Sequence, residues 1–142
     1  MDAHFKNRMQ LDEYLEGIPM FKDVGLDAAN YSLEGIRNFC ESIGSPHDKF
    51  KSIHVAGTNG KGTTAYLISE ALRRGGFRCG LYTSPHLIDY TERVQLNGIP
   101  ITDDEMLQFF NQYHDKLEEF KLSYFEISTA LAFWYFAEKE VD

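Results

Sequence analysis

The sequence predicts an α/β fold in which a parallel sheet is flanked by helices. Residues 51–55 form a short strand pattern that ends in a glycine-studded turn, and a helical pattern over residues 61–74 follows that turn. Residues 77–83 then form a second strand pattern. Strand, helix and strand in this order make the βαβ unit of a parallel sheet. Two strands are too few for a typical sheet of this class, so we expect it to be incomplete.

Two amphipathic helices are expected ahead of this unit. The first covers residues 10–18, where Gly17 and Pro19 provide the stop. The second covers residues 31–43 and stops at Gly44. Both patterns have apolar residues on one face, which indicates helices that pack against a core.

The helix after the glycine-studded turn is predicted from Lys61 to Arg74 and ends at Gly75-Gly76. Its apolar side chains are expected to face mostly inward. These side chains are Ala65, Leu67, Ile68, Ala71 and Leu72.

A hairpin and two further helices are expected in the second half of the chain. Asn97-Gly98, between strand patterns at 93–96 and 99–101, is a strong signal for a two-residue hairpin turn. Residues 102–105 fit a capping box that opens a helix towards Phe120. After a break at residues 123–126, residues 127–137 form a strongly apolar helix.

Composition excludes several classes of function. The chain has 142 residues, 43% of them hydrophobic, and a formal net charge of −8. A nonspecific nucleic-acid binder would need excess lysine and arginine, so we expect no nucleic-acid partner. No signal core or membrane-length apolar run is present, so we expect a cytoplasmic protein without membrane contact. Cys40 and Cys79 are expected to be reduced thiols.

Residues 57–64, here called the glycine loop, are a candidate site for the phosphates of a nucleotide. Gly57, Thr58, Asn59, Gly60, Lys61, Gly62, Thr63 and Thr64 stand between the first strand pattern and the helix. Backbone N–H groups of such a loop and the N-terminus of the helix favour anions. Lys61 adds a mobile cation and is the candidate catalytic residue. Thr63 or Thr64 adds a hydroxyl for Mg²⁺ or a phosphate oxygen.

The glycine loop does not fit the strict G-x-x-x-x-G-K-[ST] pattern. Val55 takes the position of the first glycine, and Gly62 follows the lysine. A structural turn that only tightens the chain is therefore the alternative. Three glycines, an asparagine and a lysine within six residues favour the phosphate site.

Several motifs in series resemble one known family. Gly-Thr-Asn-Gly-Lys-Gly-Thr resembles the variant P-loop of the Mur ligase superfamily. Residues 81–87, 90–94 and 97–98 then resemble the folylpolyglutamate synthases, which are often bifunctional with dihydrofolate synthase. Tyr124-Phe125-Glu126 and the earlier Gly25-Leu26 fit as well. The resemblance runs from about Leu11 to Asp142.

The resemblance implies an ATP-dependent amide ligase. In that family ATP phosphorylates a folate or pteroate carboxylate, and the amino group of L-glutamate attacks the acyl phosphate. Ser84 and Glu126 match magnesium-binding positions, which join Thr63 as candidate metal ligands. The segment from Ser84 to Arg93 matches the pterin side of the substrate pocket, with Ser84, Pro85, His86 and Arg93 as candidates. The resemblance does not choose between dihydrofolate synthesis, polyglutamate elongation or both.

Each of these residues also has a structural interpretation. Glu126 can be a carboxylate that favours the N-terminus of a helix, and Ser84-Pro85 can be an ordinary turn. His86 can be a hydrogen-bonded loop histidine, and Arg93 can pair with Glu92 or Glu105. Asp103, Asp104 and Glu105 are better explained as charge at the start of a helix than as a metal site.

The resemblance implies that residues 1–142 are the N-terminal part of the ATP-binding domain, the central domain of the Mur ligases, whose parallel sheet is like that of P-loop NTPases. Residues 1–50 would give the leading helices and 51–83 the βαβ unit. Residues 84–101 would give the substrate-side loop and hairpin, and 102–142 the later helices. A C-terminal domain, a Glu-Val-Gly segment, a metal-binding histidine and a modified lysine are expected in the family but not found in this sequence.

We therefore expect this chain to be inactive alone, although the full-length enzyme would use ATP, Mg²⁺, folate or dihydropteroate, and L-glutamate. We expect the full-length enzyme to be a monomer and this chain to self-associate through exposed edges. Two alternatives are another Mur-type ligase acting on a cell-wall precursor, and a stand-alone nucleotide-binding module without chemistry.

Overall fold

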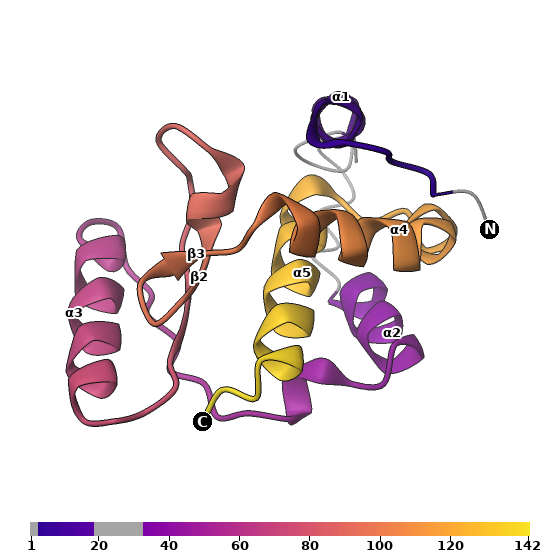
Figure 1. The fold of residues 1–142 in the computed structure, drawn as a ribbon. Coiled ribbons are helices and arrows are strands. Elements are labelled where there is room, and N and C mark those ends of the chain that lie inside the picture. Colours follow the sequence, from indigo (N-terminus) through magenta and orange to yellow (C-terminus); the bar gives the residue numbers. More distant parts are fainter. Residues whose placement is uncertain (1–2, 19–32) are drawn as a thin grey trace. The chain divides into compact units, whose positions relative to one another are not determined.

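The computed structural model describes residues 3–18 and 33–142. The chain divides into two compact units, each drawn from separate parts of the sequence (Figure 1). Unit 1 takes in residues 1–45 and 103–131, and unit 2 takes in residues 46–102 and 132–142. None of the described helices is long and apolar enough to cross a membrane.

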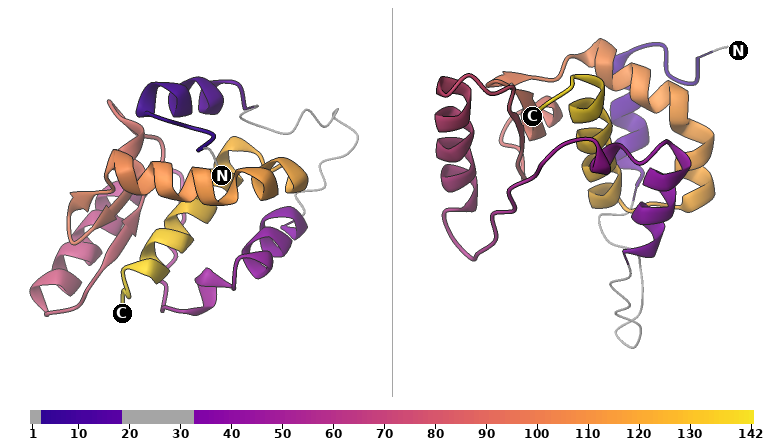
Figure 2. Two further views of the ribbon diagram at one scale, coloured as in Figure 1. Left: turned by 45° about the vertical axis from the view of Figure 1, so that its right-hand side comes forward. Right: turned by 90° about the horizontal axis from the view of Figure 1, so that it is seen from below.

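Unit 1 is helical. It contains α1 (Arg8–Glu16), α2 (Glu34–Ser42), α4 (Asp103–Phe120) and the first part of α5 (Tyr124–Glu138). Helix α4 lies between α1 and α2 (Figure 2). The core consists of fully or nearly fully buried apolar side chains from these helices, among them Leu11, Leu15, Phe39, Met106, Phe109, Phe110, Leu117 and Ile127.

The ends of α1 and α2 follow from local chemistry. The Asn7 side chain accepts a hydrogen bond from the backbone N–H of Gln10 at 3.1 Å, which caps α1. Gly17 forms the C-cap of α1, as its position in the sequence predicted. Gly44 has a φ of 92°, which ends α2 at the predicted glycine. Pro19, Gly25-Leu26 and the predicted start of the second helix at residue 31 lie outside the described residues.

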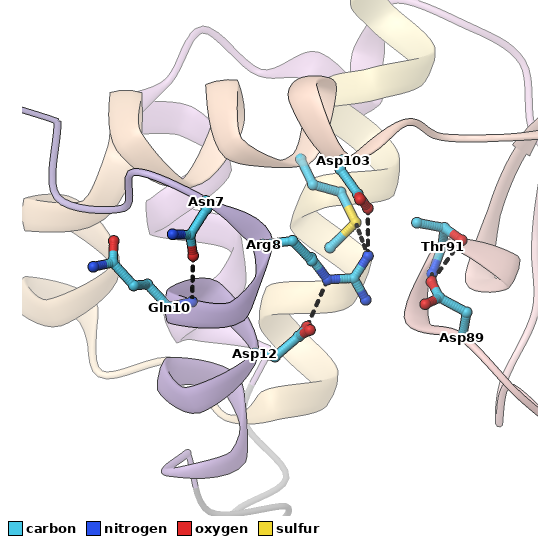
Figure 3. A network of polar contacts seen from close by, with 8 residues as sticks. Asn7, Arg8, Gln10, Asp12, Asp89, Thr91 and Asp103 are labelled. Carbon is cyan, nitrogen blue, oxygen red and sulfur yellow. Dashed lines mark hydrogen bonds and ion pairs between the residues drawn. The ribbon is translucent and has the colours of Figure 1, made fainter.

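Arg8 links the start of α1 to the start of α4. Its guanidinium lies 2.6 Å from carboxylate oxygens of both Asp12 and Asp103 (Figure 3). The acidic first turn of α4 is therefore helix-start charge with an arginine partner, as expected.

Unit 2 contains α3 (Lys61–Arg74) and a three-stranded antiparallel sheet in the order β1-β2-β3. The strands are β1 (Gly80–Tyr82), β2 (Val94–Leu96) and β3 (Ile99–Pro100). The turn between β2 and β3 is the predicted one, because Asn97 and Gly98 have φ values of 50° and 82°.

Gly80 fixes how β1 meets the end of α5 within unit 2. A Cβ at residue 80 would lie 2.5 Å from Cδ1 of Phe136, closer than atoms can approach. The absence of a side chain at residue 80 therefore lets the aromatic ring lie directly against the strand.

The predicted parallel βαβ unit of residues 51–83 is not formed among the described residues. No strand is assigned at 51–55, and only Gly80–Tyr82 of the second pattern is a strand. That strand pairs in antiparallel order with β2, the first strand of the hairpin and the middle strand of the sheet. A strand exists only where a partner completes its ladder of hydrogen bonds, and none of the described residues provides that partner for 51–55. The α/β class itself is confirmed.

Two predictions about helices also need correction. None of the side chains of α3 is buried, and Leu67 is 62% exposed, although five apolar positions were expected to face mostly inward. An amphipathic pattern shows which face can be buried, but burial needs a partner surface. Residues 124–126 are the first turn of α5 and not a break, because Ser123 caps the helix just before them.

Both cysteines are free thiols, as expected. Cys40 is buried in α2, and burial raises the pKa of its thiol to about 11. Burial also raises the pKa of the Cys79 thiol, which lies just before β1. Neither environment stabilises a thiolate, so neither residue has the surroundings of a nucleophilic cysteine.

Candidate functional site

The glycine loop has the backbone conformation that a phosphate site requires. Gly57 and Gly60 have φ values of 152° and 75°, which side-chain-bearing residues rarely adopt. Gly60 is the N-cap of α3, and Thr64 donates the first helical hydrogen bond to its carbonyl at 2.9 Å. The N–H groups of residues 61–63 precede that bond and have no acceptor within the helix. They are the donors that a phosphate would use.

Lys61 is the first residue of α3, and its side chain folds back over the loop. Its Nζ donates to the carbonyl of Gly57 and, at 3.4 Å, to the carbonyl of Thr58. The ammonium group therefore lies above the loop backbone and close to the N-terminus of the helix. Every residue from 57 to 64 is exposed, so a ligand can reach these groups from solvent.

Ser84 follows β1 in unit 2, where it begins the loop that leads to β2. The Ser84-Pro85 peptide bond is cis, and the Ser84 side chain is exposed. The loop is closed at its base by a hydrogen bond of 3.0 Å from the Thr83 N–H to the Arg93 carbonyl. Residues 84–93 thus form one loop that projects from one end of the sheet.

Arg93 and His86 are in contact within this loop. Nε of Arg93 donates to Nδ1 of His86 at 2.8 Å, and the guanidinium carbon lies 5.5 Å from the ring centre of Tyr90. Arg93 is 5% exposed, so this contact is largely shielded from water. The expectation of a hydrogen-bonded loop histidine is confirmed for His86. The contact assigns Arg93 a role in shaping the loop.

Sequence reasoning missed Glu92 as an organising residue. Its two carboxylate oxygens accept backbone hydrogen bonds from Leu87, Ile88 and Asp89, at 2.9, 3.0 and 2.9 Å. These bonds, with the one from Leu87 first, hold the pKa of the Glu92 carboxyl below its ordinary value. Leu87 and Ile88 are 91% and 92% exposed at the loop tip. The carboxylate therefore orders an apolar tip that has no cover among the described residues.

The sequence contains a recognisable signal for the role of Glu92, a capping box. Asp89 and Glu92 form a capping box around the short 3₁₀ turn Tyr90–Arg93, in the Asp-x-x-Glu spacing. Asp89 also accepts from the N–H and hydroxyl of Thr91, at 2.8 and 2.7 Å (Figure 3). Asp89 and Glu92 have the same spacing as Thr102 and Glu105, the capping box predicted before the later helix.

Glu126 occupies the first turn of α5 and caps it. One of its carboxylate oxygens accepts from the Ser123 N–H at 2.8 Å and from the Ser123 hydroxyl at 2.7 Å. The Glu126 N–H reaches the same hydroxyl at 3.4 Å. The structural interpretation of Glu126 is thus realised, and it leaves the second carboxylate oxygen available for a further role.

The candidate magnesium ligands do not fall in one unit. Thr63 and Ser84 belong to unit 2, whereas Glu126 belongs to unit 1. Two hydroxyls and a carboxylate are hard oxygen donors that suit Mg²⁺, and Thr63 and Ser84 are exposed. The chemistry of the donor set fits the ion, and the joint site of these three residues stays a prediction.

Comparisons with known proteins point to one kind of enzyme. The chain is 44% identical over 102 residues to the dihydrofolate synthase/folylpolyglutamate synthase of Bacillus subtilis strain 168, which covers 68% of this chain and 24% of the relative. No protein-family model matches the chain.

Solved structures give the same result. Mycobacterium tuberculosis folylpolyglutamate synthase complexed with ADP matches with a TM-score of 0.84 and 29% identity, over 94% of this chain and 30% of that one. A folylpolyglutamate synthase complexed with AMPPCP and folate matches with a TM-score of 0.83 and 31% identity, over 96% and 33%. The chain thus spans between about a quarter and a third of the length of these proteins.

Proposed function

This chain is homologous to part of the folylpolyglutamate synthases and dihydrofolate synthases, which are ATP-dependent ligases, and we propose on that premise that it carries the nucleotide site of such a ligase. The proposed reaction joins L-glutamate to dihydropteroate, to tetrahydrofolate or to both. Because the chain spans only part of its relatives, the reaction is proposed for a polypeptide that also has the remaining parts. We also propose that this polypeptide is located in the cytoplasm.

The glycine loop is the observation that carries the proposal. It combines two glycines at positive φ, the free N-terminus of α3 and a lysine at the first position of that helix. These features together bind phosphate groups through backbone amides, a helix dipole and one cation. A homologue of known structure is complexed with ADP, which supports a nucleotide as the ligand of this loop.

The proposed chemistry converts a poor acyl donor into a good one. The carboxylate of the pterin substrate takes the γ-phosphoryl group of ATP, which releases ADP and leaves an acyl phosphate. The glutamate amine then attacks the acyl carbon, an amide forms, and phosphate departs with the electrons of the broken C–O bond. The N–H groups of residues 61–63 would hold the phosphate oxygens in place for the transfer.

Lys61 has a defined part in this scheme. Its ammonium group would leave the carbonyls of Gly57 and Thr58 and turn to the transferring phosphoryl group, whose negative charge it offsets. Mg²⁺, which Thr63, Ser84 and Glu126 would hold, neutralises charge on phosphate oxygens when it is bound.

The 84–93 loop is proposed to face the pterin substrate. A homologue has been solved with AMPPCP and folate together, which supports a folate-type substrate for the family. In this chain the loop carries an exposed apolar tip, Leu87 and Ile88, and a polar pair, Arg93 and His86. A flat aromatic ring with a polar edge suits such a surface.

Nucleotide binding to the chain tests the proposal. Isothermal titration with Mg·ADP should give one site, and Lys61→Ala should weaken it about 10- to 100-fold, since a hydrogen bond from a charged group is worth roughly 1.5–3 kcal/mol. Lys49→Ala is the matched control, because Lys49 is an exposed lysine of unit 2 outside the glycine loop. It should leave the affinity unchanged.

Two outcomes would contradict the proposal. Equal affinity of the wild type and Lys61→Ala would remove the glycine loop from the nucleotide site. Binding of a muramyl nucleotide in preference to folate and dihydropteroate would move the chain to the cell-wall branch of Mur-type ligases.

A further inference from the structure

His4, His114 and Asp115 gather three side chains of the types that bind metal ions. One ligand atom from each lies within 4.8 Å of the others. Oδ1 of Asp115 is 3.5 Å from Nε2 of His4 and 3.2 Å from Nδ1 of His114. We propose that these three residues bind one divalent transition-metal ion, with Zn²⁺ as the representative ion. None of the three belongs to the glycine loop or to the candidate magnesium ligands.

The distances suit a metal of this class. In a tetrahedral site with Zn–N bonds of about 2.0–2.1 Å, neighbouring ligand atoms lie about 3.3 Å apart. Both separations from Asp115 are close to that value. Two imidazoles and one carboxylate are typical ligands of Zn²⁺, whereas Mg²⁺ and Ca²⁺ prefer oxygen. A fourth position would be left for water.

The backbone next to His4 is held in place on α4. The Phe5 N–H donates to Oδ1 of Asn111 at 2.8 Å, and Nδ2 of Asn111 donates to the Phe5 carbonyl at 2.9 Å. The Phe5 ring is 7% exposed, and its centre lies 6.4 Å from that of Phe110. One asparagine and one buried ring thus fix the backbone of the residue that follows His4.

The His114 ring is also held by its neighbours. It stacks on the His4 ring with centres 4.0 Å apart and planes at 17°. Phe5 and Tyr14 contact it at 5.5 and 5.7 Å between ring centres. The Asp115 side chain is 86% exposed, so an ion can enter from that side. Because the two ring planes are nearly parallel, at least one ring must rotate about its side-chain bonds before both imidazoles can bind one ion, which can approach from the exposed Asp115 side.

A bound ion would fasten the N-terminal segment to α4. His4 precedes α1, whereas His114 and Asp115 lie in α4, far along the sequence. Because an ion that binds only the folded chain stabilises it, the thermal midpoint should rise with the metal concentration. The role is thus structural, and its readout does not depend on ligase activity.

Metal titration of the chain tests this site. Zn²⁺, titrated in competition with a chromophoric chelator, should bind with a stoichiometry of one and raise the thermal midpoint by several degrees. His4→Gln and Asp115→Asn should each weaken this binding at least about tenfold, since each removes one of three ligands. Both side chains are substantially exposed, so both variants should fold.

Two matched controls separate this site from general surface binding. Asp48→Asn alters another adjacent histidine–aspartate pair, in which His47 and Asp48 lie 3.7 Å apart. His54→Gln removes a different exposed histidine. Both should keep the wild-type affinity for Zn²⁺.

Co²⁺ gives an independent check of the ligands. Its visible absorption should indicate nitrogen and oxygen ligands, and it should disappear in His4→Gln. A thiolate-to-cobalt charge-transfer band would place the ion on a cysteine and overturn the proposal. Unchanged Zn²⁺ affinity in both His4→Gln and Asp115→Asn would also overturn it, as would an equal loss in the two controls.

Discussion

At the scale of single residues, Glu92 shows how one side chain can order a whole loop tip. Three consecutive backbone N–H groups, of residues 87–89, converge on its carboxylate. Without that acceptor the N–H groups would turn to water, and the apolar side chains of Leu87 and Ile88 would lose their fixed position. The surface proposed for the pterin substrate therefore depends on Glu92 for its order.

Glu92 should titrate below 4.5, the ordinary value of its pKa. Because the pKa is lower in the folded state, the carboxylate contributes stability above its unfolded pKa and loses it as the pH falls through the folded pKa. Carboxyl chemical shifts followed by NMR between pH 2 and 7, roughly the range of carboxyl titration, check this.

Glu92→Gln tests the same contact at neutral pH. The amide oxygen can replace one carboxylate oxygen, but the NH₂ group cannot accept from the Leu87 N–H. Hydrogen exchange of the Leu87 amide should therefore be faster in the variant and unchanged in Glu119→Gln, which alters an exposed glutamate. Equal exchange rates in the wild type and Glu92→Gln would contradict the assignment.

Gly80 is a second residue whose role can be isolated. Gly80→Ala would place a Cβ 2.5 Å from the ring of Phe136, which is 7% exposed and cannot move freely. Overpacking of this kind costs about 1–3 kcal/mol of unfolding free energy, measurable by urea denaturation.

Gly62→Ala is the control for this substitution, because nothing lies within 4 Å of the added Cβ and the position is helical. Its stability should be unchanged or slightly higher. Adding Phe136→Leu to Gly80→Ala should recover part of the loss, since the smaller side chain relieves the clash. Additive losses in the double variant would show that the two residues do not interact.

At the scale of elements, the sequence predicted the helices and the hairpin well. Helix signals are local, so Gly17, Gly44 and Gly75 ended the predicted helices where the structure ends them. Asn97-Gly98 determined its turn for the same reason. Pairing of residues 51–55 depends on a strand elsewhere in the chain, so periodicity could not decide it.

The residues of the candidate site also differ in whether the sequence alone predicts their roles. Gly57, Gly60 and Lys61 were predictable because glycines at positive φ and a lysine next to the start of a helix form a recognisable local pattern in the sequence. The contact between Arg93 and His86 was not predictable, because it depends on how the loop folds back on itself. Glu92 is intermediate. The sequence shows its capping-box spacing from Asp89, but only the structure shows that its carboxylate binds the backbone of the loop tip.

Two substitutions at the start of α5 separate the two roles of Glu126, which are to cap the helix and to serve as a candidate magnesium ligand. Ser123→Ala removes the capping hydroxyl and should lower the unfolding free energy by about 0.5–2 kcal/mol in urea denaturation. Glu126→Gln keeps a side chain that can complete a capping box, so its stability should stay close to that of the wild type.

The proposed magnesium role gives Glu126→Gln a separate signature. The variant should lose the increase in ADP affinity that Mg²⁺ produces in the wild type, since the neutral amide is a weaker ligand for this ion. Ser123→Ala, which keeps the carboxylate, should retain that increase. An equal response to Mg²⁺ in the wild type and Glu126→Gln would leave Glu126 as a helix cap alone.

At the scale of the whole molecule, each unit is assembled from two separate parts of the sequence. Helix α5 contributes residues to both. The glycine loop and Ser84 belong to unit 2. Glu126 and the proposed metal ligands His4, His114 and Asp115 belong to unit 1. The loop proposed to bind phosphate thus lies wholly within unit 2.

The most direct test of the central claim locates the nucleotide on the chain. A ¹⁵N-labelled chain titrated with Mg·ADP should show saturable shifts of the backbone amides of Gly57, Gly60, Lys61 and Gly62, because these groups bracket the proposed phosphate site. The same titration of Lys61→Ala should reach saturation only at a nucleotide concentration about 10- to 100-fold higher. Shifts confined to residues outside 57–64, or none at saturating nucleotide, would contradict the assignment of the glycine loop as the phosphate site.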